Sequence, residues 1–98
     1  MKKLLTLALT VIFSISAVSA FAADTIRIGV AGPYSGDLAS YGIPTANAAK
    51  IVVDEINAKG GVLGMQVELF IEDDECKPEK ATNTATKLVS DEVIAVIG

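Results

Sequence analysis

Residues 54–64 read DEINAKGGVLG, and this stretch decides the fold because it ends a helix and turns the chain toward a strand. The apolar residues before and within it recur at intervals of three and four: Ala49, Val52, Val53 and Ile56. This spacing predicts an amphipathic helix over residues 40–59, with Pro44 in its first turn. Gly60 and Gly61 then stop the helix, because glycine readily adopts the left-handed conformation that closes many helices.

Strands are predicted on both sides of this helix. Residues 25–30 (TIRIGV) and 66–71 (QVELFI) are rich in β-branched and aromatic side chains, which favour strands. Residues 32–37 (GPYSGD), between the first strand and the helix, are dense in turn-forming residues. The chain is therefore expected to leave the sheet there.

A second helix and a third strand follow the acidic run at residues 72–75. The helix is predicted to begin at Pro78, a residue favoured in the first helical turn. Its apolar stripe consists of Ala81, Ala85, Leu88 and Val89. Residues 93–97 are apolar throughout, as expected for a parallel strand that is buried on both faces. In this chain the strand is expected to be a bare apolar edge. Asp74 is expected to accept hydrogen bonds from backbone amides in the turn before the second helix.

This alternation predicts an α/β fold with a parallel sheet in the order β-α-β-α-β. Right-handed crossovers place the first strand between the second and the third, with the helices on opposite faces. The loops after the first and third strands then diverge and open a crevice, where ligands of such sheets bind. Residues 32–41 form one wall of this crevice, and the other wall is expected to begin after Gly98.

Residues 1–22 are predicted to be a cleaved signal peptide. Lys2 and Lys3 precede an apolar run over residues 4–15, and Ala-Phe-Ala at 20–22 matches a cleavage pattern. A membrane anchor is the alternative, but the run is shorter than the roughly 20 residues that a spanning helix needs. The remaining segment, residues 23–98, has six basic and twelve acidic side chains, which argues against binding nucleic acid. We therefore expect a soluble periplasmic protein.

The sequence predicts a non-enzyme without catalytic residues, cofactor or metal. The glycines at 29, 32 and 36 do not have the spacing of a nucleotide-binding loop. Ser35 does not lie in a nucleophile elbow, and the chain has no histidine to serve as its base. Ser35 is instead either a turn serine that caps backbone groups or a hydrogen-bond donor to a ligand. The acidic run at 72–75 is too short to supply the six oxygens of a typical cation site, so a solvated turn is expected.

Cys76 is the only cysteine of the chain. In an oxidising compartment, an unpaired cysteine indicates a missing partner or a free thiol. We expect a partner beyond Gly98.

Five motifs carry a resemblance to a known family. They are IRIGVAGPYSG at 26–36, ASYG at 39–42, DEINAKGGVLG at 54–64, EDDECKPEKA at 72–81 and AVIG at 95–98. Together they resemble the Leu/Ile/Val-binding family of periplasmic proteins, which serves branched-chain amino-acid ABC transporters. The resemblance covers essentially all of residues 23–98. It implies a type I periplasmic binding protein with two lobes that close on the ligand, of which this segment is the first half of the N-terminal lobe.

The resemblance also implies roles for individual residues. Tyr41 is expected to line the pocket for the ligand side chain, and Ser35 to lie at the mouth of the cleft. In some relatives the cysteine at the position of Cys76 pairs with one shortly after the third strand. Lys77 is a departure, because relatives often have an aspartate there that caps the second helix.

The implied partners are a small amino acid, with a branched-chain amino acid as the family default, and the permease of an ABC transporter in the membrane. The full-length protein is expected to be a monomer. An extracellular ligand-sensing domain of a receptor with the same fold remains the alternative. A secreted enzyme is the weaker rival.

Overall fold

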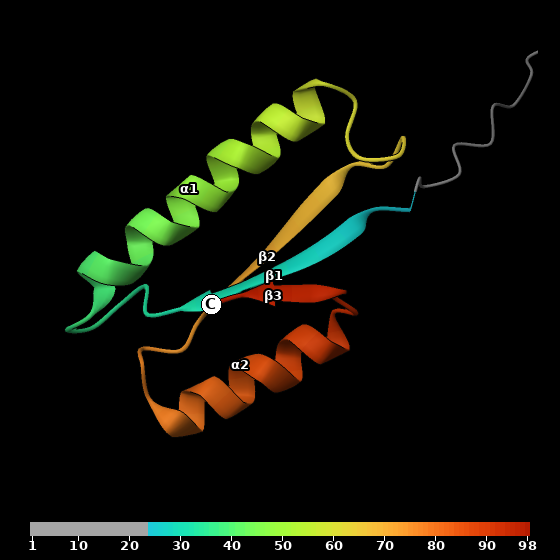
Figure 1. The fold of residues 1–98 in the computed structure, drawn as a ribbon. Coiled ribbons are helices and arrows are strands. Elements are labelled where there is room, and N and C mark those ends of the chain that lie inside the picture. Colours follow the sequence, from blue (N-terminus) through green and yellow to red (C-terminus); the bar gives the residue numbers. More distant parts are fainter. Residues whose placement is uncertain (1–23) are drawn as a thin grey trace, which may run out of the picture.

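The computed structural model describes residues 24–98, which form one open sheet with a helix on each face (Figure 1). The predicted signal peptide, residues 1–22, lies outside the described residues. The elements are β1 (Ile26–Gly32), α1 (Ala39–Ala58), β2 (Val67–Asp73), α2 (Pro78–Ser90) and β3 (Ala95–Ile97). No helix within residues 24–98 is long and apolar enough to span a bilayer.

The sheet has the strand order β2-β1-β3, and both pairs of strands are parallel. The β1–β2 ladder runs from Ile26 opposite Val67 to Gly32 opposite Asp73. Helices α1 and α2 lie on opposite sides of the sheet (Figure 1). The predicted α/β class, element order and strand order are therefore confirmed.

The core is small and centres on β1. Val30 of β1 is completely buried, and Leu88 of α2 is 2% exposed. Leu88 packs over Gly29, where an added Cβ would lie 3.1 Å from its methyl carbons. The absence of a side chain at Gly29 thus lets α2 approach the middle strand closely.

The packing face of α2 differs from the predicted stripe. Thr84 and Leu88 are the buried residues of this helix, whereas Ala81, Ala85 and Val89 are exposed. Thr84 and Leu88 lie one turn apart on one line of the helix, and the three exposed residues lie to one side of it. The contacts of Leu88 with Gly29 and of the Thr84 hydroxyl with the Asp73 carbonyl oxygen fix the rotation of the helix.

The third strand is not buried on both faces but forms the bare apolar edge that is also expected of it. β3 pairs only with β1, and all three of its residues are exposed, including Val96 at 52% and Ile97 at 48%. β3 is therefore an edge strand. Between α1 and the sheet lies an apolar hollow of about 720 Å³, which reaches Ile97.

Pro44 lies in the second turn of α1 rather than in the first. The helix begins earlier than predicted because residues 36–38 already coil: the Ala39 amide donates to the Gly36 carbonyl, and the Tyr41 amide to the Leu38 carbonyl. Proline has no N–H, so the Ser40 carbonyl oxygen cannot receive its usual helical hydrogen bond from residue 44.

The end of α1 is as the glycine pair predicts. The Gly60 amide donates to the Asn57 carbonyl oxygen and the Gly61 amide to the Ile56 carbonyl oxygen. This is the Schellman pattern of hydrogen bonds. Both glycines have positive φ, +103° and +83°. The Asn57 side chain also forms two 2.8 Å hydrogen bonds with the backbone of Val67, one as donor and one as acceptor. The motif at 54–64 thus ends the helix and attaches it to the start of β2.

Candidate functional site

A pocket of about 270 Å³ lies where β1 and β3 end, and we call it the switch-point pocket. Its lining residues are Ala31, Gly32, Pro33, Tyr34, Tyr41, Gly42, Thr45, Asp74, Cys76 and Gly98. They come from the end of β1, the loop after it, the first turns of α1, the loop after β2 and the residue after β3. The crevice that the topology predicts is therefore present, with the loop after β1 as one of its walls.

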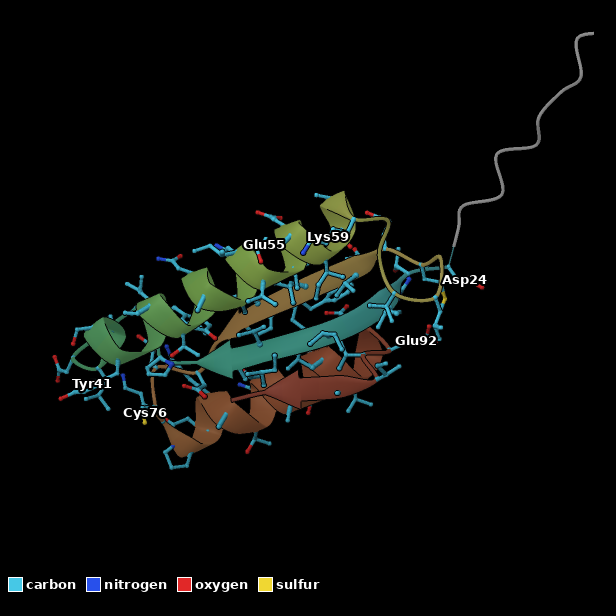
Figure 2. The ribbon with its side chains drawn as sticks, turned by 45° about the horizontal axis from the view of Figure 1, so that its top comes forward. Asp24, Tyr41, Glu55, Lys59, Cys76 and Glu92 are labelled. Carbon is cyan, nitrogen blue, oxygen red and sulfur yellow. The ribbon has the colours of Figure 1, made fainter. Side chains whose placement is uncertain are left out.

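Tyr41 reaches this pocket because of its neighbour Gly42. Gly42 is buried, and a Cβ at that position would lie 1.8 Å from the Pro33 carbonyl oxygen. The missing side chain allows the start of α1 to pack directly against the loop after β1. The Tyr41 side chain is 75% exposed, and Figure 2 shows it at the same end of the molecule as Cys76.

Tyr34 is a second aromatic residue of the pocket that the sequence did not single out. Its ring lies over Gly32, where an added Cβ would be 3.2 Å from the phenol oxygen. The hydroxyl is buried and has no hydrogen-bond partner within residues 24–98. Burial raises the pKa of Tyr34, and the negative charges of Asp74 and Asp73 add to the shift. The phenol therefore stays protonated at neutral pH.

Removing this hydroxyl tests the placement of the ring. We expect Tyr34→Phe to raise the free energy of unfolding by about 1 kcal/mol, because a buried hydroxyl without a partner costs its desolvation. The measurement is urea denaturation of the complete gene product, meaning this chain with everything that its gene encodes after Gly98. A loss of stability would show that the hydroxyl has a partner.

Asp73 connects the loops on either side of the pocket. Its carboxylate accepts hydrogen bonds from the Tyr34 amide at 2.8 Å, the Glu75 amide at 2.9 Å and the Ser35 hydroxyl. The bond from Ser35 is the main reason that the pKa of Asp73 is lowered, and the bond from the Tyr34 amide comes second. Asp73 is therefore a carboxylate at neutral pH and joins the loop after β1 to the loop after β2.

Ser35, a predicted site residue, does not line the switch-point pocket. It is exposed, and its hydroxyl donates to Asp73 rather than to a backbone group. The hydroxyl proton is thus engaged by Asp73. A ligand contact of Ser35 stays a prediction.

Cys76 lies beside the pocket and is exposed. Its backbone has a left-handed conformation with φ of +57°, and its amide donates to the Asp74 carboxylate at 2.8 Å. This hydrogen bond confirms the role predicted for Asp74. Lys77 is the N-cap of α2 and gives no side-chain hydrogen bond to the start of the helix. The disulfide of Cys76 stays a prediction.

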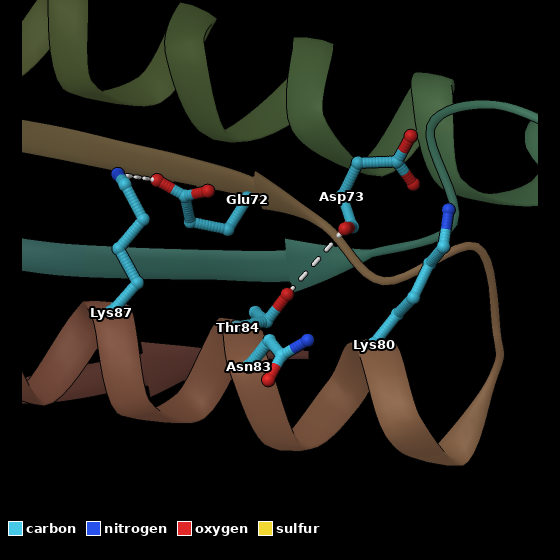
Figure 3. Close-up of a pocket in the computed structure, with 6 residues that line it drawn as sticks. All are labelled: Glu72, Asp73, Lys80, Asn83, Thr84 and Lys87. Carbon is cyan, nitrogen blue, oxygen red and sulfur yellow. Dashed lines mark hydrogen bonds and ion pairs between the residues drawn. The ribbon is translucent and has the colours of Figure 1, made fainter.

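Two residues of the acidic run, Glu72 and Glu75, form ion pairs with lysines of α2. Lys87 pairs with Glu72 and Asp91, and Lys80 pairs with Glu75. Both lysines line a polar hollow of about 200 Å³, and Figure 3 shows their side chains projecting from α2 toward the end of β2. The bond to Glu72 is the main cause of the raised pKa of Lys87. Within the described part of the chain, no group of acidic, histidine or cysteine residues is arranged to hold a metal ion.

Comparison with known families gives one decisive match. The model of the family described as periplasmic binding protein matches residues 25–98. The chain belongs to this periplasmic binding protein family. A curated relative from Pseudomonas aeruginosa, the leucine-, isoleucine-, valine-, threonine-, and alanine-binding protein, is 41% identical over 92 residues. That alignment covers 89% of this chain and 25% of the relative.

Solved structures of periplasmic binding proteins have the same arrangement of elements. The branched-chain amino acid transporter substrate binding protein LivJ of Streptococcus pneumoniae, in complex with isoleucine, has a TM-score of 0.73 and 41% identity. The extracellular ligand-binding receptor of Verminephrobacter eiseniae has a TM-score of 0.74 and 27% identity. Each match covers 76% of this chain, but only 22% of the first structure and 21% of the second. The chain thus spans about a quarter of its relatives' length or less.

Proposed function

We propose that this chain is the first part of the N-terminal lobe of a solute-binding protein, and that the protein delivers a small amino acid to an ABC importer. The observation that carries the proposal is the switch-point pocket with Tyr41 on its wall. Ligands of open parallel sheets bind at this place, where the loops after neighbouring strands diverge. Family membership supports the same location.

The chemistry of the pocket indicates which part of the ligand it receives. Tyr41 and Tyr34 offer aromatic surface against which an aliphatic side chain packs well. Asp74 is the charged residue of the lining, and no lysine or arginine lines the pocket within residues 24–98. We therefore assign the ligand side chain to this wall of the pocket. The names of the relatives favour a branched-chain amino acid.

The proposal includes export and a membrane partner. Residues 1–22 act as a signal peptide, and residues 23–98 form a part of the lobe in the periplasm. Closure of two lobes around the amino acid creates the surface that the permease recognises. The proposed role is capture and delivery, without chemical conversion of the ligand.

Titration calorimetry tests the proposal. The complete gene product is titrated with L-leucine, L-isoleucine, L-valine, L-threonine and L-alanine, and with D-leucine as the control for a specific site. We expect at least one L-amino acid to bind with Kd of about 10 μM or tighter, which corresponds to about 7 kcal/mol of binding free energy. The absence of binding by all five L-amino acids would contradict the proposal.

The second candidate is the sensory domain of a receptor. The similarity to the extracellular ligand-binding receptor of Verminephrobacter eiseniae favours it. The coding sequence after Gly98 distinguishes the two functions. A second α/β lobe followed by a stop codon supports the transport protein, whereas a membrane span and a signalling domain after the lobes support the receptor.

A further inference from the structure

We propose that Asp73 is a positioning residue of the switch-point pocket: it holds the loop of Tyr34 and Ser35 in the conformation that receives the ligand. This inference rests on the proposed function. Asp73 itself does not line the pocket, so it acts through the residues to which it is bonded.

The first observation is the number of hydrogen bonds that meet at one side chain. The Asp73 carboxylate receives the Tyr34 amide, the Ser35 hydroxyl and the Glu75 amide. Two of these donors lie nearly 40 positions away in the sequence, in the loop after β1. One carboxylate thus fixes two consecutive residues of a loop that has no helix or strand of its own.

The second observation is that Asp73 is itself held firmly. It is the last residue of β2, opposite Gly32, and the next amide, that of Asp74, donates to the Gly32 carbonyl at 2.9 Å. Its own carbonyl oxygen receives the hydroxyl of the buried Thr84, as the dashed line between them in Figure 3 shows. Asp73 is therefore attached to both β1 and α2.

The third observation links this anchor to the pocket. Tyr34 donates its amide to Asp73 and also lines the pocket with its side chain. The same loop provides Pro33, whose carbonyl oxygen lies against Gly42 beside Tyr41. Release of the loop would therefore disturb both aromatic walls. Binding sites lose affinity when the supporting residues no longer hold the contact residues in place.

Asp73→Asn is the sharpest test, because it preserves the shape of the side chain. Asparagine keeps one oxygen for the amides of Tyr34 and Glu75, but its NH₂ group can only donate to the Ser35 oxygen, so a neutral hydrogen bond replaces the bond to the carboxylate. For the complete gene product, we expect Kd for L-leucine to rise about fivefold, because a hydrogen bond to a charged group is roughly twice as strong as one between neutral groups. Ser35→Ala removes the same bond from the other side and carries the test if Asp73→Asn does not fold.

Glu72→Gln is the matched control. Glu72 precedes Asp73 in β2, and its loss removes the same charge, but its partner is Lys87 of α2. We expect both variants to lower the melting temperature by a few degrees, whereas only Asp73→Asn raises Kd. If Asp73 and Ser35 act through one bond, the variant that combines Asp73→Asn with Ser35→Ala raises Kd no more than Ser35→Ala alone.

The outcomes separate this inference from the proposed function. Wild-type binding together with an unchanged Kd in both Asp73→Asn and Ser35→Ala would overturn the positioning role and leave the proposed function intact. An equal rise of Kd in Glu72→Gln would also overturn it, because the rise would then come from the loss of a negative charge and not from the release of the loop after β1. Failure of the wild-type protein to bind any of the five L-amino acids would contradict the proposed function itself.

Discussion

Replacing Gly42 by alanine is expected to lower the free energy of unfolding by about 3 kcal/mol or more, the range of severe overpacking. The added Cβ would lie 1.8 Å from the oxygen and 2.6 Å from the carbonyl carbon of Pro33. Both atoms belong to the backbone, so no flexible side chain can move aside. Gly42 has no positive φ, and the cost therefore comes from the clash and not from the conformation of residue 42. The start of α1 would have to move away from the loop after β1.

Urea denaturation of the complete gene product measures this loss. Ser40→Ala is the control, because Ser40 is exposed in the same helical turn. It should change the free energy of unfolding by less than about 0.5 kcal/mol, as is usual for surface substitutions. A Gly42→Ala variant as stable as Ser40→Ala would mean that the helix does not approach Pro33 this closely.

Replacing Tyr41 by alanine is expected to raise Kd for L-leucine about 30-fold. Burial of an aromatic ring against an aliphatic side chain contributes about 2 kcal/mol, which corresponds to this factor. Because Tyr41 is 75% exposed, its ring contributes little to the stability of the fold. The substitution should therefore weaken binding while the melting temperature of the ligand-free protein changes little.

Titration calorimetry of the complete gene product measures this effect. Ile51→Ala is a matched control, because Ile51 is a large exposed apolar residue of the same helix and does not line the switch-point pocket. We expect its Kd to stay within about twofold of the wild type, since surface changes away from a site have small effects. An unchanged affinity of Tyr41→Ala would remove Tyr41 from the binding site.

The fold could be predicted because its signals are local. The glycine pair after residue 59 and the spacing of apolar residues before it define α1, and Pro78 defines the start of α2. The handedness of crossovers then fixes the strand order without any knowledge of side-chain contacts. The position of the crevice follows from that order alone.

The contacts of the site could not be predicted in the same way, because they join segments that are distant in the sequence. Asp73 and Ser35 lie 38 positions apart, and no spacing rule relates them. In the sequence Gly42 is an ordinary residue of a helix, and only the structure shows that the Pro33 carbonyl oxygen lies close to it.

The central place of β1 has a consequence for the timing of folding. β1 is the first strand to be synthesised, yet Ile26 pairs with Val67 and Ile28 with Ala95. The ribosome adds roughly 5–20 residues per second, so β1 remains without its second partner for several seconds. Pairings between such distant segments also form slowly, because a long loop must close first. A chain with this topology completes its sheet late in synthesis, which is compatible with the export that we propose.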